Sequence, residues 1–399
     1  MLKKETNINF TFNLKTHTIC GEGKAAQLHC NLSELGYTKP GIIVDSSIID
    51  LPYVQKIIKS IVQENSLDPI IWKYDLGAEP DYDSLDHIRE TFLDSERKPI
   101  VNCFVGIGGG SVIDFAKGLA TVTVNLDKSV TYRGFPKDLI RSLPTIALPT
   151  TAGTGSEVTY NAVFTDHNIG KKLGINTMNN FPVLSILDPI LTLSCPESVT
   201  ASSGMDALVH TMESYVAKQA SPMSRIFAKN AFDLIFNNLF RIADEPKDLE
   251  TRGKLQFGAY LAGISLINSG SGPAGALSYT LGVHFHVPHG LAGAVFLPYI
   301  VEHNVRNGYD YSELYDLIEG VDLSLSQEEK NKIFVDKFFE LTKKLKIPAH
   351  ITPFGVNPKN INKLLSDIDG FEGAFSQNPI PFTLDDGKNL VRKMINVEE

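Results

Sequence analysis

An acid and a histidine stand four residues apart in the stretch Gly204-Met-Asp-Ala-Leu-Val-His210, as Asp206 and His210. Positions i and i+4 lie one turn apart on the same face of a helix, so a carboxylate oxygen and an imidazole nitrogen there can reach one divalent ion. A second stretch, Gly282-Val-His-Phe-His-Val-Pro-His289, crowds three histidines into six residues. Alone, the first pair could equally be a solvated hydrogen-bonded pair. Together, the two stretches favour a metal site in an enzyme.

A glycine-rich turn, Gly106-Ile-Gly-Gly-Gly-Ser111, lies between an apolar run and a helical pattern. Glycines let the main chain turn tightly and let a pyrophosphate approach it, and the N-terminus of a following helix favours an anion. The spacing differs from the Gly-x-Gly-x-x-Gly of a Rossmann fingerprint, so this turn alone could be only a tight turn. A second turn rich in Thr and Gly, at 150–156, strengthens the interpretation, because two such turns could face one dinucleotide-binding crevice.

Asp45 is the acid that ends the short apolar run at 41–45. At the end of a strand, its carboxylate could accept hydrogen bonds from an adenosine ribose and would repel a 2′-phosphate. The alternative is an acid near the start of the next helix, with no part in binding.

The strand and helix patterns predict two domains. Strands are expected at 41–45, 69–74, 100–107, 145–148 and 184–187, with helical periodicity between several of them. This alternation predicts an α/β domain at 1–190 with a doubly wound, mainly parallel sheet and helices on both faces. Helical patterns dominate afterwards, which predicts an all-α domain at 191–399; they lie at 205–216, 223–242, 249–267, 291–303, 330–345 and 385–395.

Composition limits the partners and the setting. With 399 residues the chain is too long for one ordinary core, and 43% hydrophobic with 21% charged residues is typical of a soluble globular protein. The net charge of −9 argues against nucleic acid as a partner. Four scattered cysteines suggest a reducing compartment, no apolar run is long enough to span a membrane, and the N-terminus has no signal-peptide pattern. We therefore expect a cytoplasmic protein.

Four motifs together resemble the iron-containing (group III) alcohol dehydrogenase family. They are Gly-Gly-Gly-Ser-Val-Ile-Asp-Phe-Ala-Lys at 108–117, Leu-Pro-Thr-Thr-Ala-Gly-Thr-Gly-Ser-Glu-Val-Thr at 148–159, Gly-Met-Asp-Ala-Leu-Val-His at 204–210 and Phe-His-Val-Pro-His-Gly-Leu-Ala at 285–292. Their order and spacing agree with the family as well, and the resemblance spans nearly the whole chain.

The resemblance implies a dinucleotide-binding domain, a helical metal-binding domain and an active-site cleft between them. The metal would be Fe²⁺ or Zn²⁺, held by Asp206, His210 and His289, and it would act on the oxygen of a small alcohol, polyol or aldehyde while NAD exchanges a hydride with the substrate carbon. NADP is less expected than NAD, because Asp45 resembles the family's NAD-selecting acid. By motif position the cofactor-binding residues would be Asp45, Gly108, Gly109, Gly110, Ser111, Asp114, Thr150, Thr151, Thr154 and Lys172.

One departure from the family concerns the metal ligands. The family commonly has a third ligand His fourteen residues before the His of the Pro-His-Gly motif and a further His four residues after that ligand. This chain has Gly275 and Tyr279 there. Either His284 or His286 could compensate, or each could be an ordinary packed histidine. We assign proton transfer to His286.

Two other functions remain open. Two histidines and one carboxylate are also the ligand set of non-haem iron sites, so a sugar-acid alcohol oxidase of the octulosonate 8-oxidase type is the alternative enzyme. A metal-free, non-catalytic dinucleotide-binding relative is the other alternative. The resemblance, with a strand or hairpin expected at 7–19 that would need an edge partner, also predicts a homodimer.

The first testable prediction concerns Asp45. We expect NAD to be preferred over NADP, and Asp45→Gly to relax this preference by removing charge repulsion against a 2′-phosphate. Steady-state kinetics with both cofactors checks it. Equal efficiency of NADP and NAD in the unmodified protein would contradict the assignment.

Overall fold

The computed structural model describes residues 9–76, 80–137 and 139–395. It contains two compact units. Among the described residues, one unit lies within 14–151 and 155–195, and the other comprises residues 196–395 together with residues 9–13 and 152–154. The predicted division of the chain at residue 190 stays a prediction. No helix in the described ranges has both the length and the apolar character needed to cross a membrane.

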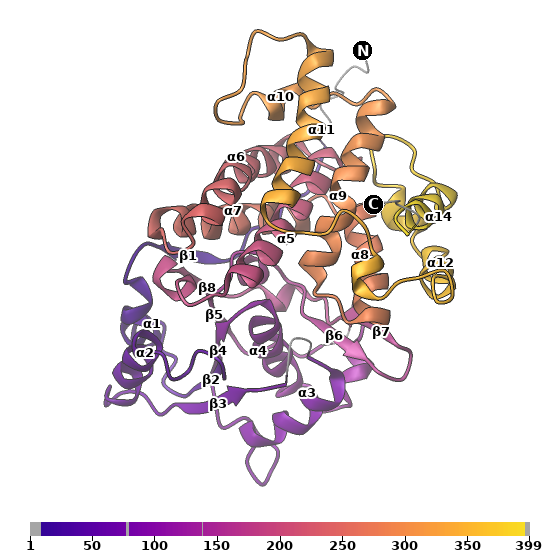
Figure 1. Ribbon diagram of the computed structural model, residues 1–399. Coiled ribbons are helices and arrows are strands. Elements are labelled where there is room, and N and C mark those ends of the chain that lie inside the picture. The colour runs from indigo at the N-terminus through magenta and orange to yellow at the C-terminus, as the bar shows by residue number, and fades with distance from the viewer. Residues whose placement is uncertain (1–8, 77–79, 138, 396–399) are drawn as a thin grey trace. The chain divides into compact units, whose positions relative to one another are not determined.

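Six parallel strands form the sheet of the N-terminal unit, in the order β1-β8-β5-β4-β2-β3 (Figure 1). Their bounds are β1 His17–Cys20, β2 Pro40–Asp45, β3 Ile70–Tyr74, β4 Cys103–Gly108, β5 Thr145–Pro149 and β8 Leu184–Leu187. Five of these strands, β2, β3, β4, β5 and β8, lie where the sequence predicts them. The strand expected at 7–19 is wrong in extent, because β1 begins only at His17 and residues 9–16 form no strand, while residues 7 and 8 lie outside the described residues. β1 is an edge strand, and the homodimer stays a prediction.

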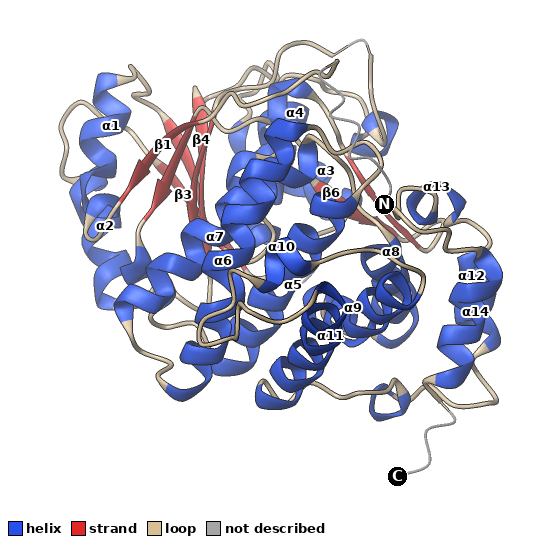
Figure 2. Cartoon of the chain, turned by 90° about the horizontal axis from the view of Figure 1, so that it is seen from above, coloured by secondary structure: helices blue, strands red, loops and turns tan. Residues whose placement is uncertain are grey.

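Helices cover both faces of this sheet, as predicted, because its strands are apolar on both sides. Alternate residues of β2 show it: Ile42 and Val44 pack into one core with α1 Leu28–Glu34 and α2 Pro52–Val62, whereas Ile43 packs into the other. The second core lies under α3 Tyr82–Arg89 and α4 Gly110–Val122. Figure 2 shows the sheet between these two pairs of helices.

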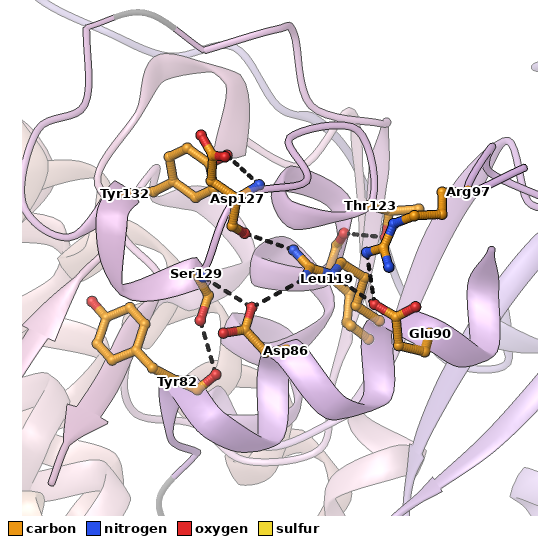
Figure 3. A network of polar contacts seen from close by, with 10 residues as sticks. Tyr82, Asp86, Glu90, Arg97, Leu119, Thr123, Asp127, Ser129 and Tyr132 are labelled. Carbon is orange, nitrogen blue, oxygen red and sulfur yellow. Dashed lines mark hydrogen bonds and ion pairs between the residues drawn. The ribbon is translucent and has the colours of Figure 1, made fainter.

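Polar contacts fasten the chain after α4 to α3 (Figure 3). Ser129 donates its hydroxyl to the carbonyl of Tyr82 at 2.8 Å and its N–H to the Asp86 carboxylate at 2.9 Å. The N–H of Asp127 donates to the hydroxyl of Tyr132. The sequence analysis did not predict the small antiparallel pair that follows, β6 Val163–Asp166 and β7 Lys171–Gly174. Its strands are only four residues long, too short for a clear alternating pattern.

The C-terminal unit is helical, as predicted. The long helices are α5 Glu197–Val216, α6 Pro222–Asp244, α7 Leu249–Ile267, α8 Pro273–Phe285, α9 His289–Arg306 and α11 Gln327–Lys344, and the shorter ones are α10 Ser312–Tyr315, α12 Asn362–Ile368, α13 Glu372–Phe375 and α14 Leu384–Lys393. Phenylalanine rings of α6 and α11 contact one another in its core. The helix α8 is the one long helix absent from the sequence prediction.

Candidate functional site

Three potential metal ligands converge in the C-terminal unit. Asp206 and His210 lie on α5, which begins eight residues earlier than predicted, and His289 is the first residue of α9. Their ligand atoms all lie within 4.8 Å of one another, and no other set of three or more His, Cys, Asp or Glu side chains in the described residues does so. The structure therefore brings together the i,i+4 pair and the histidine of the Pro-His-Gly motif.

The distances in this cluster fit a shared ion. The Nε2 atoms of His210 and His289 lie 3.8 and 3.9 Å from Oδ1 of Asp206, too far for hydrogen bonds. An ion about 2.0–2.2 Å from each ligand atom can bridge gaps of this size, and imidazole and carboxylate suit zinc and iron. Nδ1 of His210 is buried without a hydrogen-bond partner among the described residues. The residues present therefore fit the divalent ion that the sequence predicts.

A glycine after His289 brings α9 close to α5. A Cβ at Gly290 would lie 2.2 Å from the carbonyl oxygen of Ser202 and 2.8 Å from Cβ of Asp206. No side chain fits against main chain at that separation. Gly290 thus permits the helix contact that places His289 beside Asp206.

Glu213, which the sequence analysis missed, continues the stripe of α5 that carries Asp206 and His210. It is seven residues after Asp206, and the residue is only 3% exposed. Its carboxylate accepts hydrogen bonds from the N–H groups of Gly272 and Gly275 at 2.7 and 3.0 Å. Burial raises the pKa of Glu213, and these two donors oppose the shift. The i, i+4, i+7 spacing was the signal that could have identified it.

The positions around the expected third histidine ligand are occupied differently. Gly275 lies in the first turn of α8, where an added Cβ would come within 2.9 Å of Oε2 of Glu213. Tyr279 packs its ring against His289, with ring centroids 4.9 Å apart. His284 bonds to Asp367 at 2.7 Å instead of joining the ligand cluster. The structure therefore does not include His284 in the ligand cluster.

His286, to which we assign proton transfer, is the C-cap residue that follows α8. It is exposed, and its φ of 54° lies in the left-handed region, where histidine is found more often than most residues. The turn at His286 lets the chain leave α8 and begin α9 three residues later. Its catalytic role stays a prediction.

The two glycine-rich turns leave neighbouring strands of the N-terminal unit. Gly108 ends β4 and pairs with Pro149 at the end of β5, and the N–H of Thr150 donates to the carbonyl of Gly108 at 2.9 Å. Because parallel strands end at the same edge, the first turn and the start of the second meet there. Asp45 ends β2, the other neighbour of β4, so it lies at the same edge.

The first glycine-rich turn leads into α4. A side chain is sterically excluded at Gly108 but has room at Gly109. A Cβ at Gly108 would lie 2.5 Å from Cγ2 of Val112, so no side chain fits there. At Gly109 it would make only ordinary contacts of 3.5 Å with Thr151, and φ is −72°. Gly110 and Ser111 form the first turn of α4, whose N–H groups favour an anion.

Asp114, one turn further along α4, has hydrogen-bond partners within the N-terminal unit. Its carboxylate accepts hydrogen bonds from the hydroxyl of Ser156 and, at 3.0 Å, from the N–H of Val163. The fully buried Lys117 lies 3.6 Å from it and donates to Ser156 at 2.8 Å and to the carbonyl of Asn161 at 2.9 Å. This network joins α4 to the second glycine-rich turn. A direct contact of Asp114 with a cofactor stays a prediction.

The remaining predicted cofactor residues are more scattered. Asp45 already accepts two hydrogen bonds from Ser47, from its N–H at 2.9 Å and its hydroxyl at 2.7 Å. Lys172 lies on β7 opposite Thr165, in the small antiparallel pair. Thr154 groups with the C-terminal unit by its contacts, whereas Thr150 and Thr151 group with the N-terminal unit. The assignment of these residues to the cofactor stays a prediction.

Comparison with known proteins decides the family. The family model described as iron-containing alcohol dehydrogenase matches residues 15–189, and its C-terminal counterpart, described as Fe-containing alcohol dehydrogenase family, C-terminal, matches residues 200–395. The chain belongs to the iron-containing alcohol dehydrogenase family. It is 30% identical to alcohol dehydrogenase 4 of Schizosaccharomyces pombe over 381 residues, which cover 96% of this chain and 88% of that relative.

Two other proteins are similar to this chain over nearly their full lengths. The NAD-dependent methanol dehydrogenase of Bacillus methanolicus is 28% identical, covering 96% of this chain and 99% of its own. The crystal structure of sulfoacetaldehyde reductase from Bifidobacterium kashiwanohense in complex with NAD⁺ superposes with a TM-score of 0.86 at 25% identity, covering 98% and 99% of the two chains. As an iron-containing alcohol dehydrogenase family member, the chain is an oxidoreductase of the class that acts on alcohols.

A pH-dependent prediction follows from Glu157, which is buried beside Lys117. Burial raises the pKa of Glu157 from 4.5 to about 7 and lowers that of Lys117 to about 8. Between pH 4.5 and 7 the folded chain keeps a Glu157 proton that the unfolded chain releases, so this residue's contribution to the free energy of unfolding falls as pH rises. Glu157→Gln should therefore gain stability relative to the unmodified protein between pH 5 and pH 7.5, measured by urea unfolding.

The control for this prediction is Glu96→Gln, at a surface position whose side chain is 69% exposed. Its stability relative to the unmodified protein should be the same at both pH values. If the free energy of unfolding of Glu157→Gln differs from that of the unmodified protein by the same amount at pH 5 and pH 7.5, Glu157 does not titrate between these pH values.

Proposed function

We propose that this chain is a metal-dependent oxidoreductase that transfers a hydride between NAD(H) and a small alcohol, polyol or aldehyde. The observation that carries the proposal is the convergence of Asp206, His210 and His289 within 4.8 Å in a member of this family. A divalent iron or zinc ion held by these side chains would supply a Lewis acid for the substrate oxygen.

The carboxyl edge of the parallel sheet supports the choice of dinucleotide. The turn at 108–111 offers main-chain N–H groups at a helix N-terminus, and Asp45 ends the adjacent strand. A relative named NAD-dependent methanol dehydrogenase and a similar structure solved in complex with NAD⁺ agree with this choice. We propose NAD as the cofactor, with NADP disfavoured by the Asp45 charge.

The ligand side chains also bear on the substrate. Three protein ligands leave coordination positions for substrate oxygens, which a vicinal diol or hydroxy acid could fill with two atoms. We therefore propose a preference for polyhydroxylated substrates. His286 is exposed and three residues from His289, so it can exchange a proton with solvent, and we propose it as the proton carrier.

The same ligand set is also compatible with a second class of enzyme, an oxidase. Two histidines and a carboxylate also serve oxygen-using iron enzymes, which is the observation that favours a sugar-acid alcohol oxidase as the second candidate. Such an enzyme would consume oxygen instead of accumulating NADH.

One assay separates these functions. Purified protein is analysed for bound metal, and NADH formation and oxygen uptake are followed on a panel of alcohols and polyols. We expect metal together with NADH formation, and we expect His289→Ala to lose both, because Asp206 and His210 alone cannot hold the ion. The matched control is His284→Gln, which changes a histidine of α8 outside the ligand cluster and should retain the metal.

Three results of this assay would contradict the proposal. Oxygen uptake without NADH would identify the oxidase. A metal-free protein that turns over fully in excess chelator would exclude the metal mechanism. A protein that binds NAD but has neither metal nor turnover would be a non-catalytic relative.

A further prediction tests the glycine-rich turn at 108–111. Gly109→Val should remain folded, because φ is −72° and a Cβ meets only ordinary contacts, but its methyl groups would occupy the approach to the main chain. Titration calorimetry should show NAD affinity reduced at least about tenfold, or about 1.4 kcal/mol. A thermal melt confirms folding, and unchanged affinity in the folded variant would refute the assignment of this turn.

A further inference from the structure

The hydroxyl of Ser278 lies between Gly275 and the proposed ligand His289. Ser278 is fully buried on α8. Its Oγ is 2.6 Å from the carbonyl oxygen of Gly275 and 2.8 Å from Nδ1 of His289. These three groups form a short relay that starts on α8 and ends on the first residue of α9.

The direction of each bond in the relay follows from the number of hydrogens. A serine hydroxyl has one hydrogen, whereas a carbonyl has none. Two oxygens 2.6 Å apart need that hydrogen between them, so Ser278 donates to Gly275. Its Oγ must then accept from His289, which places the proton of the neutral imidazole on Nδ1. The lone pair is left on Nε2, the atom that lies 3.9 Å from Oδ1 of Asp206.

Glu213 holds the far end of this relay in place. Its buried carboxylate binds the N–H groups of Gly272 and Gly275, in the first turn of α8. The carbonyl of Gly275 that receives the Ser278 hydroxyl therefore belongs to a turn anchored to α5, the helix of Asp206 and His210. At position 275, where the family commonly supplies a ligand side chain, this chain contributes its main chain instead.

We propose that Ser278 is a positioning residue that fixes the tautomer and ring orientation of His289 so that Nε2 faces the metal position. The inference rests on the metal centre of the proposed function. Hydrogen-bond partners of ligand imidazoles typically change metal affinity by about 10–100-fold when removed. In a centre with three protein ligands, the orientation of each one should matter correspondingly.

The first measurement reads the imidazole directly and needs no metal. Side-chain ¹⁵N NMR of histidine-labelled, metal-free protein, at a pH where the imidazole is neutral, should show the Nδ1–H form for His289, with His289→Gln identifying the signal. Ser278→Ala should move this signal toward a mixture of tautomers, because its partner is gone. Ser278→Thr keeps the hydroxyl and should retain the original form.

The second measurement is the affinity for Zn²⁺ and Co²⁺ added to the metal-free protein, by competition with a chelator. Ser278→Ala should bind each about 10–100-fold more weakly and should change the visible absorption of the Co²⁺ form. The matched control is Thr280→Val, which removes another buried hydroxyl of α8 that also bonds three residues back, to Leu277 at 2.8 Å. Thr280→Val should leave both readings unchanged.

The outcomes separate this inference from the proposed function. If the unmodified protein binds metal and Ser278→Ala changes neither the His289 tautomer nor the affinity, the role of Ser278 is overturned and the metal centre stands. If the unmodified protein binds no metal, both are overturned. Equal losses in Ser278→Ala and Thr280→Val would show a general effect of α8 packing and would also overturn the role of Ser278.

Discussion

A buried carboxylate has to be matched by hydrogen-bond donors, and this requirement organises the centre of the C-terminal unit. Glu213 is enclosed by protein, and it finds its donors in the first turn of α8. That turn leads to Ser278 and from there to His289, while α5 itself carries Asp206 and His210. The carboxylate of Glu213 thereby connects α5 to α8, and Ser278 connects α8 to α9 beside the ligand cluster. Gly290 supplies the other condition, the close approach of α9 to α5.

The N-terminal unit depends on a different constraint, the common polarity of its strands. Because β2, β4 and β5 are parallel neighbours, Asp45, the first glycine-rich turn and the start of the second lie at the carboxyl edge of the sheet. Two charged side chains of α4, those of Asp114 and Lys117, have hydrogen-bond partners within the protein. Asp114 and Lys117 join α4 to the segment after β5 through hydrogen bonds with Ser156, Val163 and Asn161. The main-chain N–H groups that begin α4 lie at this same edge, where we propose that the dinucleotide binds.

Much of this could be predicted from local patterns. Buried parallel strands are mostly apolar runs, as at 41–45 and 184–187, and the pair Asp206 and His210 shows a helical spacing. The helix α8 could not be predicted, because 273–285 is apolar on nearly every side and contains glycines, so it lacks a contrasting polar face. The role of Ser278 could not be predicted either. Its partner His289 lies eleven residues away, and neither a helix nor a strand brings residues at that spacing into contact. Glu213 was within reach of the same reasoning that identified Asp206.

The side chain of Lys117 has a consequence for how the N-terminal unit moves. It starts on α4 and ends on two points of the following segment, the hydroxyl of Ser156 and the carbonyl of Asn161. If this segment separated from α4 one residue at a time, the ammonium group of Lys117 and the carboxylate of Asp114 would lose their buried partners at the first step. Opening is therefore expected to be all-or-none, with the main-chain amides between 156 and 163 exchanging their hydrogens with solvent as a single cooperative unit.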